Sequence, residues 1–150
     1  MPKSELAVRV VLDTNTIISG LLWKGAPHAV LGLIEQGRIS PFISPPLITE
    51  LREVLERPKF KLHLEAVAET PDNALGRYLQ YAEIVDVSTT PPLVVARDPD
   101  DDQVLACAVA ASVDYIVSGD RHLLDLGSYQ GVPILNAADF MQAYATAPAA

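Results

Sequence analysis

The segment RDPDDDQ, residues 97–103, places four aspartates directly before the apolar run VLACAVAA. Two carboxylates about 4 Å apart repel each other by roughly 4 kcal/mol at an effective dielectric constant near 20, so such a group either stays in water or binds a cation. Aspartate also favours the cap and first turn of a helix, where the helix dipole is positive. One or two of these residues therefore have an ordinary structural explanation, and a cation site remains the alternative.

Other acids follow predicted strands. Asp13 ends the apolar run in VLDTN, Asp120 follows another in VSGDR, and Glu50 lies in the helix after a third. Asp102 begins the helix that leads to the VSGDR strand. Because open parallel sheets bind ligands at the carboxyl ends of their strands, we expect these four acids to meet in one cleft.

Helical periodicity separates the acids that face inward from their neighbours. In the helix PLITELREVLE, Glu50 lies beside the apolar stripe of leucine, isoleucine and valine. The same projection aligns Asp102 with the apolar residues that follow it and turns Asp98, Asp100 and Asp101 elsewhere. Asp102 is therefore the residue that we predict for the site from this segment.

The kinds of side chain in this cluster point to a hard cation. Carboxylates without neighbouring cysteines or paired histidines favour Mg²⁺ or Mn²⁺ and disfavour zinc. Such ions position and polarise a phosphodiester and lower the pKa of an attacking water. The chemistry that the acids predict is metal-assisted phosphodiester hydrolysis.

Short runs rich in valine, isoleucine and leucine alternate with helix-like segments. The expected strands are 6–12, 38–44, 83–88, 114–119 and 132–136. This order predicts a three-layer α/β/α domain around a central, mostly parallel sheet of five strands.

Length and composition predict a single cytoplasmic domain. The 150 residues fit one domain, ordered over about 6–143 with a frayed tail at 144–150, and no apolar run approaches the roughly 18 residues that a membrane helix needs. The N-terminus lacks the features of a signal peptide, and the single cysteine, Cys107, fits a reducing compartment. The net charge of −8 excludes a broad basic face that grips nucleic acid.

Three blocks resemble one known family. They are VVLDTNTIISGLL, ITELREVLERPKF and RDPDDDQVLACAVAASVDYIVSGDRHLL, and the resemblance extends from about residue 8 to about residue 140. In this order they are similar to PIN-domain proteins, of the branch that contains the VapC-type toxins of toxin–antitoxin systems. The resemblance implies a parallel-sheet nuclease fold, Mg²⁺ or Mn²⁺ bound by acids, cleavage of RNA, a homodimer and a small antitoxin partner.

The same resemblance assigns roles to residues of this chain. The four acids of the family correspond to Asp13, Glu50, Asp102 and Asp120, with Asn15 and Ser118 at the supporting polar positions. Asp13 and Asp102 are then the expected direct metal ligands. Glu50 and Asp120 are expected to bind the metal directly or through water, and either of them helps to activate the attacking water. Whether Asp100 or Asp101 joins the site stays open.

Basic residues near the blocks are candidate substrate contacts. In RPKFKLH, Lys59 and Lys61 flank Phe60 and could hold phosphates, or the segment is an ordinary helix end with Phe60 packed inward. Arg121, directly after Asp120, is better placed for a phosphate.

Other functions remain as alternatives. A haloacid-dehalogenase-type phosphatase would need an aspartate where this chain has Asn15, and a receiver domain would need a lysine after a late strand, where the chain reads SGDRH. The remaining alternatives are a PIN-like module that binds RNA or protein without cleaving, and an RNA-processing nuclease that is not a toxin.

Overall fold

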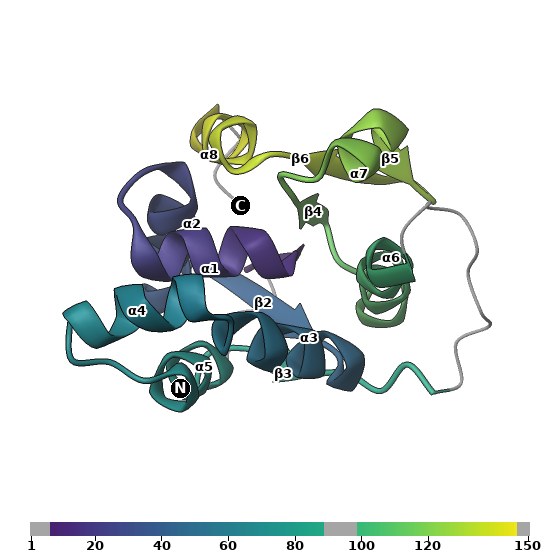
Figure 1. Ribbon diagram of the computed structural model, residues 1–150. Helices are drawn as coiled ribbons and strands as arrows, with labels where there is room; N and C mark the ends of the chain where they lie inside the picture. Colours follow the sequence, from purple (N-terminus) through teal and green to yellow (C-terminus); the bar gives the residue numbers. More distant parts are fainter. Residues whose placement is uncertain (1–6, 89–98, 147–150) are drawn as a thin grey trace.

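The computed structural model describes residues 7–88 and 99–146 (Figure 1). Its strands are β1 (Val8–Leu12), β2 (Ile39–Ile43), β3 (Glu83–Ile84), β4 (Tyr115–Val117), β5 (Ser128–Tyr129) and β6 (Val132–Leu135). They form one sheet in the order β3-β2-β1-β4-β6-β5, in which only β5 is antiparallel to its neighbour. The expectation of a mostly parallel α/β sheet is confirmed.

The sheet has six strands rather than the five expected. The additional strand, β5, has two residues and pairs with β6 through a tight turn. Gln130 and Gly131, the two residues between the strands, both have positive φ angles, of 49° and 82°. Two-residue hairpins favour this left-handed conformation, and glycine adopts it without steric strain. A two-residue strand gives no apolar run, so the sequence pattern could not reveal it.

Eight helices are described, and those packed on the sheet form layers on its two faces. They are α1 (Thr14–Leu22), α2 (Ala26–Glu35), α3 (Pro45–Leu55), α4 (Pro58–Ala66), α5 (Pro71–Leu79), α6 (Pro99–Ala111), α7 (Arg121–Leu126) and α8 (Ala137–Thr146). Figure 1 shows α1 and α2 to the left of β4 and α6 to its right, which is the expected three-layer arrangement.

The central strands are buried because helices cover both faces. All five residues of β2 are buried, as are the last three of β1. In α3 the predicted apolar stripe is also observed, since Leu47, Leu51, Val54 and Leu55 are buried. Burial of this surface fixes the orientation of α3 and therefore the side of the helix on which Glu50 lies.

The first two helices pack closely and at a steep angle. A Cβ atom at Gly20 would lie 2.8 Å from the Leu31 side chain and 2.8 Å from the Pro27 carbonyl oxygen, so only glycine fits there.

No single helix in the described segments is long and apolar enough to cross a membrane. Only α1 and α2 taken together reach that length and composition, and they are bent by 89°.

The end of the chain differs slightly from the expectation. Helix α8 continues to Thr146, so residues 144–146 are helical and do not belong to a frayed tail. Leu6, Arg97, Asp98 and residues 147–150 also carried predictions, and they lie outside the described residues.

Candidate active site

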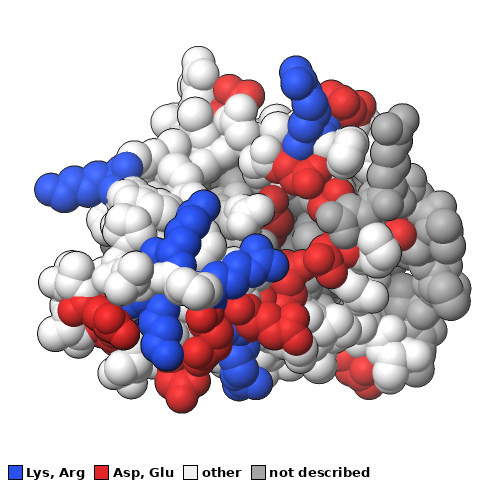
Figure 2. Space-filling model, in the orientation of Figure 1, with Lys and Arg blue, Asp and Glu red and all other residues white. Residues whose placement is uncertain are grey.

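A cavity of about 590 Å³ opens at the carboxyl ends of β1 and β4, between α1, α3 and α6. The acids that line it are Asp13, Glu50, Glu53, Asp100, Asp101 and Asp120. Figure 2 shows acidic side chains around the hollow in the middle of this face, with basic side chains beside them. The structure thus brings three of the four predicted acids, Asp13, Glu50 and Asp120, into one cavity.

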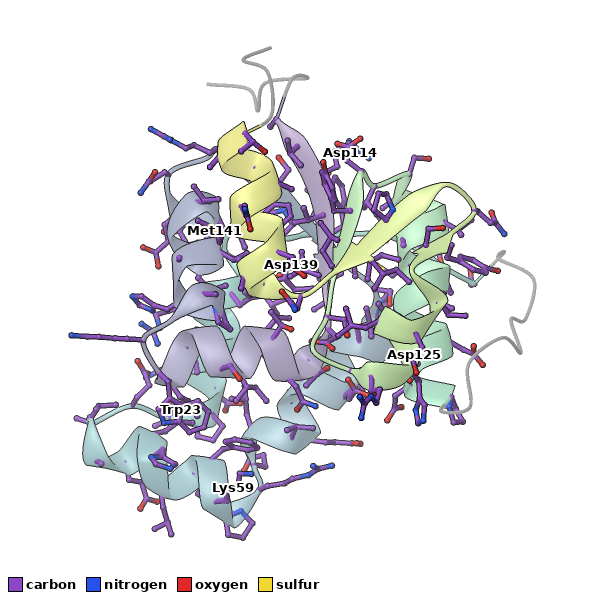
Figure 3. The ribbon with its side chains drawn as sticks, turned by 90° about the horizontal axis from the view of Figure 1, so that it is seen from above. Trp23, Lys59, Asp114, Asp125, Asp139 and Met141 are labelled. Atoms are coloured by element: carbon purple, nitrogen blue, oxygen red, sulfur yellow. The ribbon has the colours of Figure 1, made fainter. Side chains whose placement is uncertain are left out.

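Basic residues lie at the margin of the cavity. Arg57, which caps α4, is the basic residue that lines it. Lys59 and Lys61 are exposed on α4 and do not line the cavity, and Figure 3 shows Lys59 on this helix at the edge of the molecule. Arg121 is exposed at the start of α7, next to Asp120.

Asp13 is held in place by the start of α1. Its Oδ1 atom accepts a hydrogen bond of 2.8 Å from the Thr16 N–H, which makes Asp13 the N-cap of the helix. Its own N–H donates to the Val117 carbonyl oxygen of β4 at 3.1 Å, and its residue surface is only 7% exposed. The strand β1 and the cap together fix the direction of this carboxylate.

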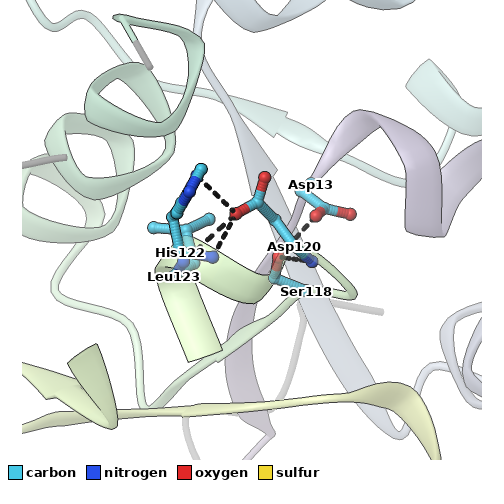
Figure 4. Close-up of polar contacts among 5 residues, drawn as sticks. All are labelled: Asp13, Ser118, Asp120, His122 and Leu123. Carbon is cyan, nitrogen blue, oxygen red and sulfur yellow. Dashed lines mark hydrogen bonds and ion pairs between the residues drawn. The ribbon is translucent and has the colours of Figure 1, made fainter. Parts of the chain in front are cut away.

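Ser118 joins the two aspartates that follow β1 and β4 (Figure 4). Its hydroxyl donates to Asp13 Oδ2 at 2.5 Å and accepts from the Asp120 N–H at 2.9 Å. The Ser118 N–H donates to the Leu135 carbonyl oxygen of β6 at 2.9 Å, and the residue is fully buried. Ser118 therefore connects these two aspartates of the cavity to strand β6.

Asp120 caps the next helix, α7. Its Oδ1 atom accepts from the N–H groups of His122 and Leu123 at 2.7 and 3.2 Å. The His122 ring atom Nδ1 lies 3.9 Å from the same oxygen. These interactions occupy one carboxylate oxygen of Asp120 and hold the side chain at the mouth of the cavity.

Glu50 meets the site from α3. The Thr14 hydroxyl donates a hydrogen bond to Glu50 Oε1. Burial, opposed by this bond and reinforced by a hydrogen bond with Asp100 and by the charges of Asp100 and Asp13, raises the pKa of Glu50 from 4.5 to about 7. At neutral pH without a cation, Glu50 is therefore protonated in a large share of molecules.

The helix α6 contributes a different aspartate from the one predicted. Asp101 is only 6% exposed and lines the cavity together with Asp100, whereas Asp102 is half-buried and does not line it. The projection that turned Asp101 away from the packed face is wrong. Asp101 lies one turn before two buried residues, Val104 and Leu105, so it shares their face of the helix.

The donor atoms are suited to a divalent cation. Among the described residues, Asp101, Asp120 and His122 each offer one ligand atom, and these atoms lie within 4.8 Å of one another. Two carboxylates and one imidazole form a donor set that Mn²⁺ accepts readily, and the further carboxylates of the cavity suit Mg²⁺ as well. The residues therefore fit the kind of ion that the sequence predicted, although His122 was not expected in the group.

Sequence reasoning missed several residues of this site. Asp101 was left open as a ligand, because the mostly apolar helix α6 has no polar face that would fix its rotation. Thr14 was not among the predicted site residues, and nothing in its position predicted the contact with Glu50. Arg57 belongs to the basic segment RPKFKLH that was considered for phosphate binding, although it was not itself among the predicted contacts.

A mostly parallel α/β/α fold with an acidic cavity at the carboxyl edge of its sheet defines the general class of this chain. A model of the PIN domain family matches residues 9–122. The chain therefore belongs to the PIN domain family, as its sequence blocks indicated.

Individual known proteins are also similar to this chain. The chain is 30% identical over 130 residues to the uncharacterized protein MJ1680 of Methanocaldococcus jannaschii, covering 84% of this chain and 80% of that protein. The fold is similar to that of VapBC2 from Rickettsia felis, solved bound to a DNA fragment from its promoter, with a TM-score of 0.58 and 15% identity over 86% of this chain and 98% of that one. A match to the RRP44 PIN domain of T. brucei has a TM-score of 0.48 and 13% identity over 94% and 83% of the two chains.

Proposed function

We propose that this chain is a metal-dependent endoribonuclease that hydrolyses phosphodiester bonds of RNA. The observation that carries the proposal is the convergence of Asp13, Glu50, Asp101 and Asp120, from four separate segments, on one cavity. The family supports it, because the PIN domain is a nuclease fold. The choice of RNA rests on the family resemblance.

We assign each residue of the cavity a separate role in hydrolysis. Asp101, Asp120 and His122, with Asp13 beside them, would hold Mg²⁺ or Mn²⁺. When bound, the ion neutralises charge on the phosphate and lowers the pKa of the attacking water. Glu50, which is half-buried and accepts a hydrogen bond from Thr14, would accept the proton from that water. Arg57 at the margin would bind a phosphate of the substrate, since a guanidinium pairs well with phosphate oxygens.

The test is cleavage of labelled single-stranded and structured RNA by the purified protein with Mg²⁺, Mn²⁺ or a chelator. We expect cleavage only with metal, and a loss of at least about 100-fold in Asp13→Asn, as for removal of one preorganised group from a polar site. Asp125→Asn is the matched control, because Asp125 is exposed on α7 and does not line the cavity. Equal rates in Asp13→Asn and wild type would refute the proposal.

We further propose that the chain is the cytoplasmic toxin of a type II toxin–antitoxin system and forms a homodimer. The support is the sequence resemblance to VapC-type toxins, together with the fold shared with VapBC2. Induced expression should then stop growth in the wild type but not in Asp13→Asn, and co-expression of a neighbouring antitoxin gene should restore it. A monomer mass by light scattering would contradict the dimer.

A further inference from the structure

An aromatic and basic patch lies outside the cavity, where the end of α1 meets α4. It consists of Trp23, Phe60, His63, Lys59 and Lys61, and we call it the Trp23 patch. Figure 3 shows Trp23 between α1 and α4, with Lys59 on the same helix α4. None of its residues lines the cavity, so hydrolysis itself does not explain it.

The Trp23 ring is held in a fixed orientation although it faces water. Its centroid lies 6.2 Å from that of Phe60 and 5.3 Å from that of His63, with interplanar angles of 65° and 76°. Phe60 is buried, whereas Trp23 remains 42% exposed. The edge-to-face contacts fix the ring and leave a large apolar surface in water. A rigid exposed aromatic ring loses little entropy when a ligand stacks on it.

The charges around this ring favour a polyanion. Lys59 Nζ lies 4.9 Å from the Phe60 centroid, Lys61 is exposed on the same helix, and Lys24 is exposed next to Trp23. Most of the surface of a chain with a net charge of −8 repels phosphate, so this concentration of lysine is informative. An apolar protein surface would not form ion pairs with these lysines, whereas the phosphates of a nucleic acid would.

Two structural connections join the Trp23 patch to the cavity. Helix α1 begins at Thr14 in the cavity and ends beside Trp23, nine residues later, which is about 13 Å along the helix axis. Arg57 lines the cavity and directly precedes α4, and α4 carries every residue of the Trp23 patch except Trp23 itself. A strand lying on the patch would therefore pass Arg57 on its way to the acids.

We propose that the Trp23 patch binds a single-stranded segment of the RNA, with one base stacked on Trp23 and neighbouring phosphates paired with Lys59 and Lys61. The strand must be single, because only an unpaired base presents its face to an aromatic ring. This inference rests on the proposed function for the identity of the substrate as RNA.

Trp23 is the only tryptophan of the chain, so its fluorescence reports directly on the patch. The probe is a uridine oligonucleotide of about 12 residues, within the range of known single-strand sites, compared with the same strand in a duplex. The protein is the full chain carrying Asp13→Asn, so that binding is measured without cleavage. We expect saturable quenching by the single strand and much weaker quenching by the duplex.

Substitutions then separate stacking from charge. In the same background, Trp23→Ala should weaken binding of the labelled strand by about 5- to 150-fold, the effect of losing one base–aromatic stack. Trp23→Phe should recover most of this affinity, and Ile84→Ala, which truncates another exposed hydrophobic residue, should change nothing. Lys59→Ala should lower the slope of log affinity against log salt concentration by about one, whereas Arg38→Ala, which changes an exposed arginine directly before β2, should not.

The outcomes distinguish this inference from the proposed function. Quenching with the expected variant effects, but no metal-dependent cleavage by the wild type, would support the Trp23 patch and refute the nuclease. Cleavage together with unchanged binding in a folded Trp23→Ala variant would refute the patch alone. Equal binding of duplex and single strand, or a fluorescence change that follows self-association without RNA, would also overturn it.

Discussion

The cavity has two sides whose carboxylates are stabilised in different ways. On one side, which we call the floor, Asp13 and Asp120 accept hydrogen bonds from backbone N–H groups, and Ser118 lies between them. On the other side, which we call the wall, Glu50 of α3 faces Asp100 of α6, and the two carboxyl groups share a hydrogen bond.

The difference shows which charges the fold satisfies by itself. Hydrogen bonds from N–H and O–H donors favour the ionised form of a carboxylate, so the floor is organised without a ligand. On the wall, Glu50 and Asp100 lie together, and the Thr14 hydroxyl donates to Glu50. Burial and the neighbouring acids raise the pKa of Glu50, so we expect the wall to be the side that responds to pH.

The largest expected effect on cleavage comes from an aspartate of α6, the helix that also carries Asp100 of the wall. Asp101→Asn should reduce cleavage by about 100- to 1000-fold, as expected for a group aimed into a polar site. Asp102→Asn, one residue further on, should stay near the wild-type rate because Asp102 does not line the cavity. Rates of purified variants with matched thermal stability decide between them. Loss in Asp102→Asn alone would restore the assignment made from the helix projection.

Ser118→Ala tests the floor. Without the hydroxyl, Asp13 Oδ2 loses a partner in a buried position and the Asp120 N–H loses one in a partly buried position. We expect the free energy of unfolding to fall by about 1–3 kcal/mol and cleavage to fall by about 10- to 100-fold. Ser44→Ala is the control, since Ser44 is equally buried at the end of β2 and donates to no carboxylate of the site. A similar loss in both variants would show that burial alone matters.

The pH dependence of stability tests the wall. Burial, with Asp100 and Asp13 nearby, raises the pKa of Glu50 to about 7 from its ordinary 4.5, so folding favours its protonated form. This stabilisation is complete below pH 4.5 and is lost as pH rises through 7. Because the group is partly solvated, we expect about 1 kcal/mol, or a Tm lower by about 2–4 °C at pH 8 than at pH 5 in chelator.

Two comparisons isolate the contribution of Glu50. The glutamine in Glu50→Gln cannot ionise. Between pH 5 and pH 8, the Tm of this variant should therefore fall by about 2–4 °C less than the Tm of the wild type. Mn²⁺ or Mg²⁺ should raise the Tm of the wild type most at pH 8, where the carboxylates are ionised. Parallel Tm curves for wild type and Glu50→Gln in chelator would mean that the wall does not respond to pH through this residue.

The smallest expected effect concerns metal preference. His122 contributes an imidazole nitrogen to a group otherwise made of carboxylates, and imidazole favours Mn²⁺ over Mg²⁺. His122→Ala should weaken Mn²⁺ binding by less than about tenfold and change Mg²⁺ binding less. Calorimetric titration of both ions measures the ratio directly, and equal losses for the two ions would exclude His122 as a selective ligand.

Much of the fold was predictable because the buried strands are continuous apolar runs. The five expected strands are all present. The sixth strand escaped prediction because two residues cannot show a period. The meeting of Asp13, Glu50 and Asp120 was also predictable, since each follows a strand of a parallel sheet.

The choice within the aspartate run was not predictable for a physical reason. The helix α6 is apolar almost all round, as VLACAVAA shows, so its sequence contains no polar face that fixes its rotation. A shift of one residue rotates the assigned face by about 100° and exchanges Asp101 for Asp102. Likewise, the exposure of Trp23 depends on how α4 packs beside α1, which no local pattern determines.

The two edges of the sheet also limit how copies of this chain can associate. In the segments that the structure describes, both edge strands, β3 and β5, have only two residues. Such short edges offer few free backbone groups for another strand to join, which protects the sheet from aggregation by continuous extension. A homodimer would therefore have to pair through its helices and not by merging two sheets.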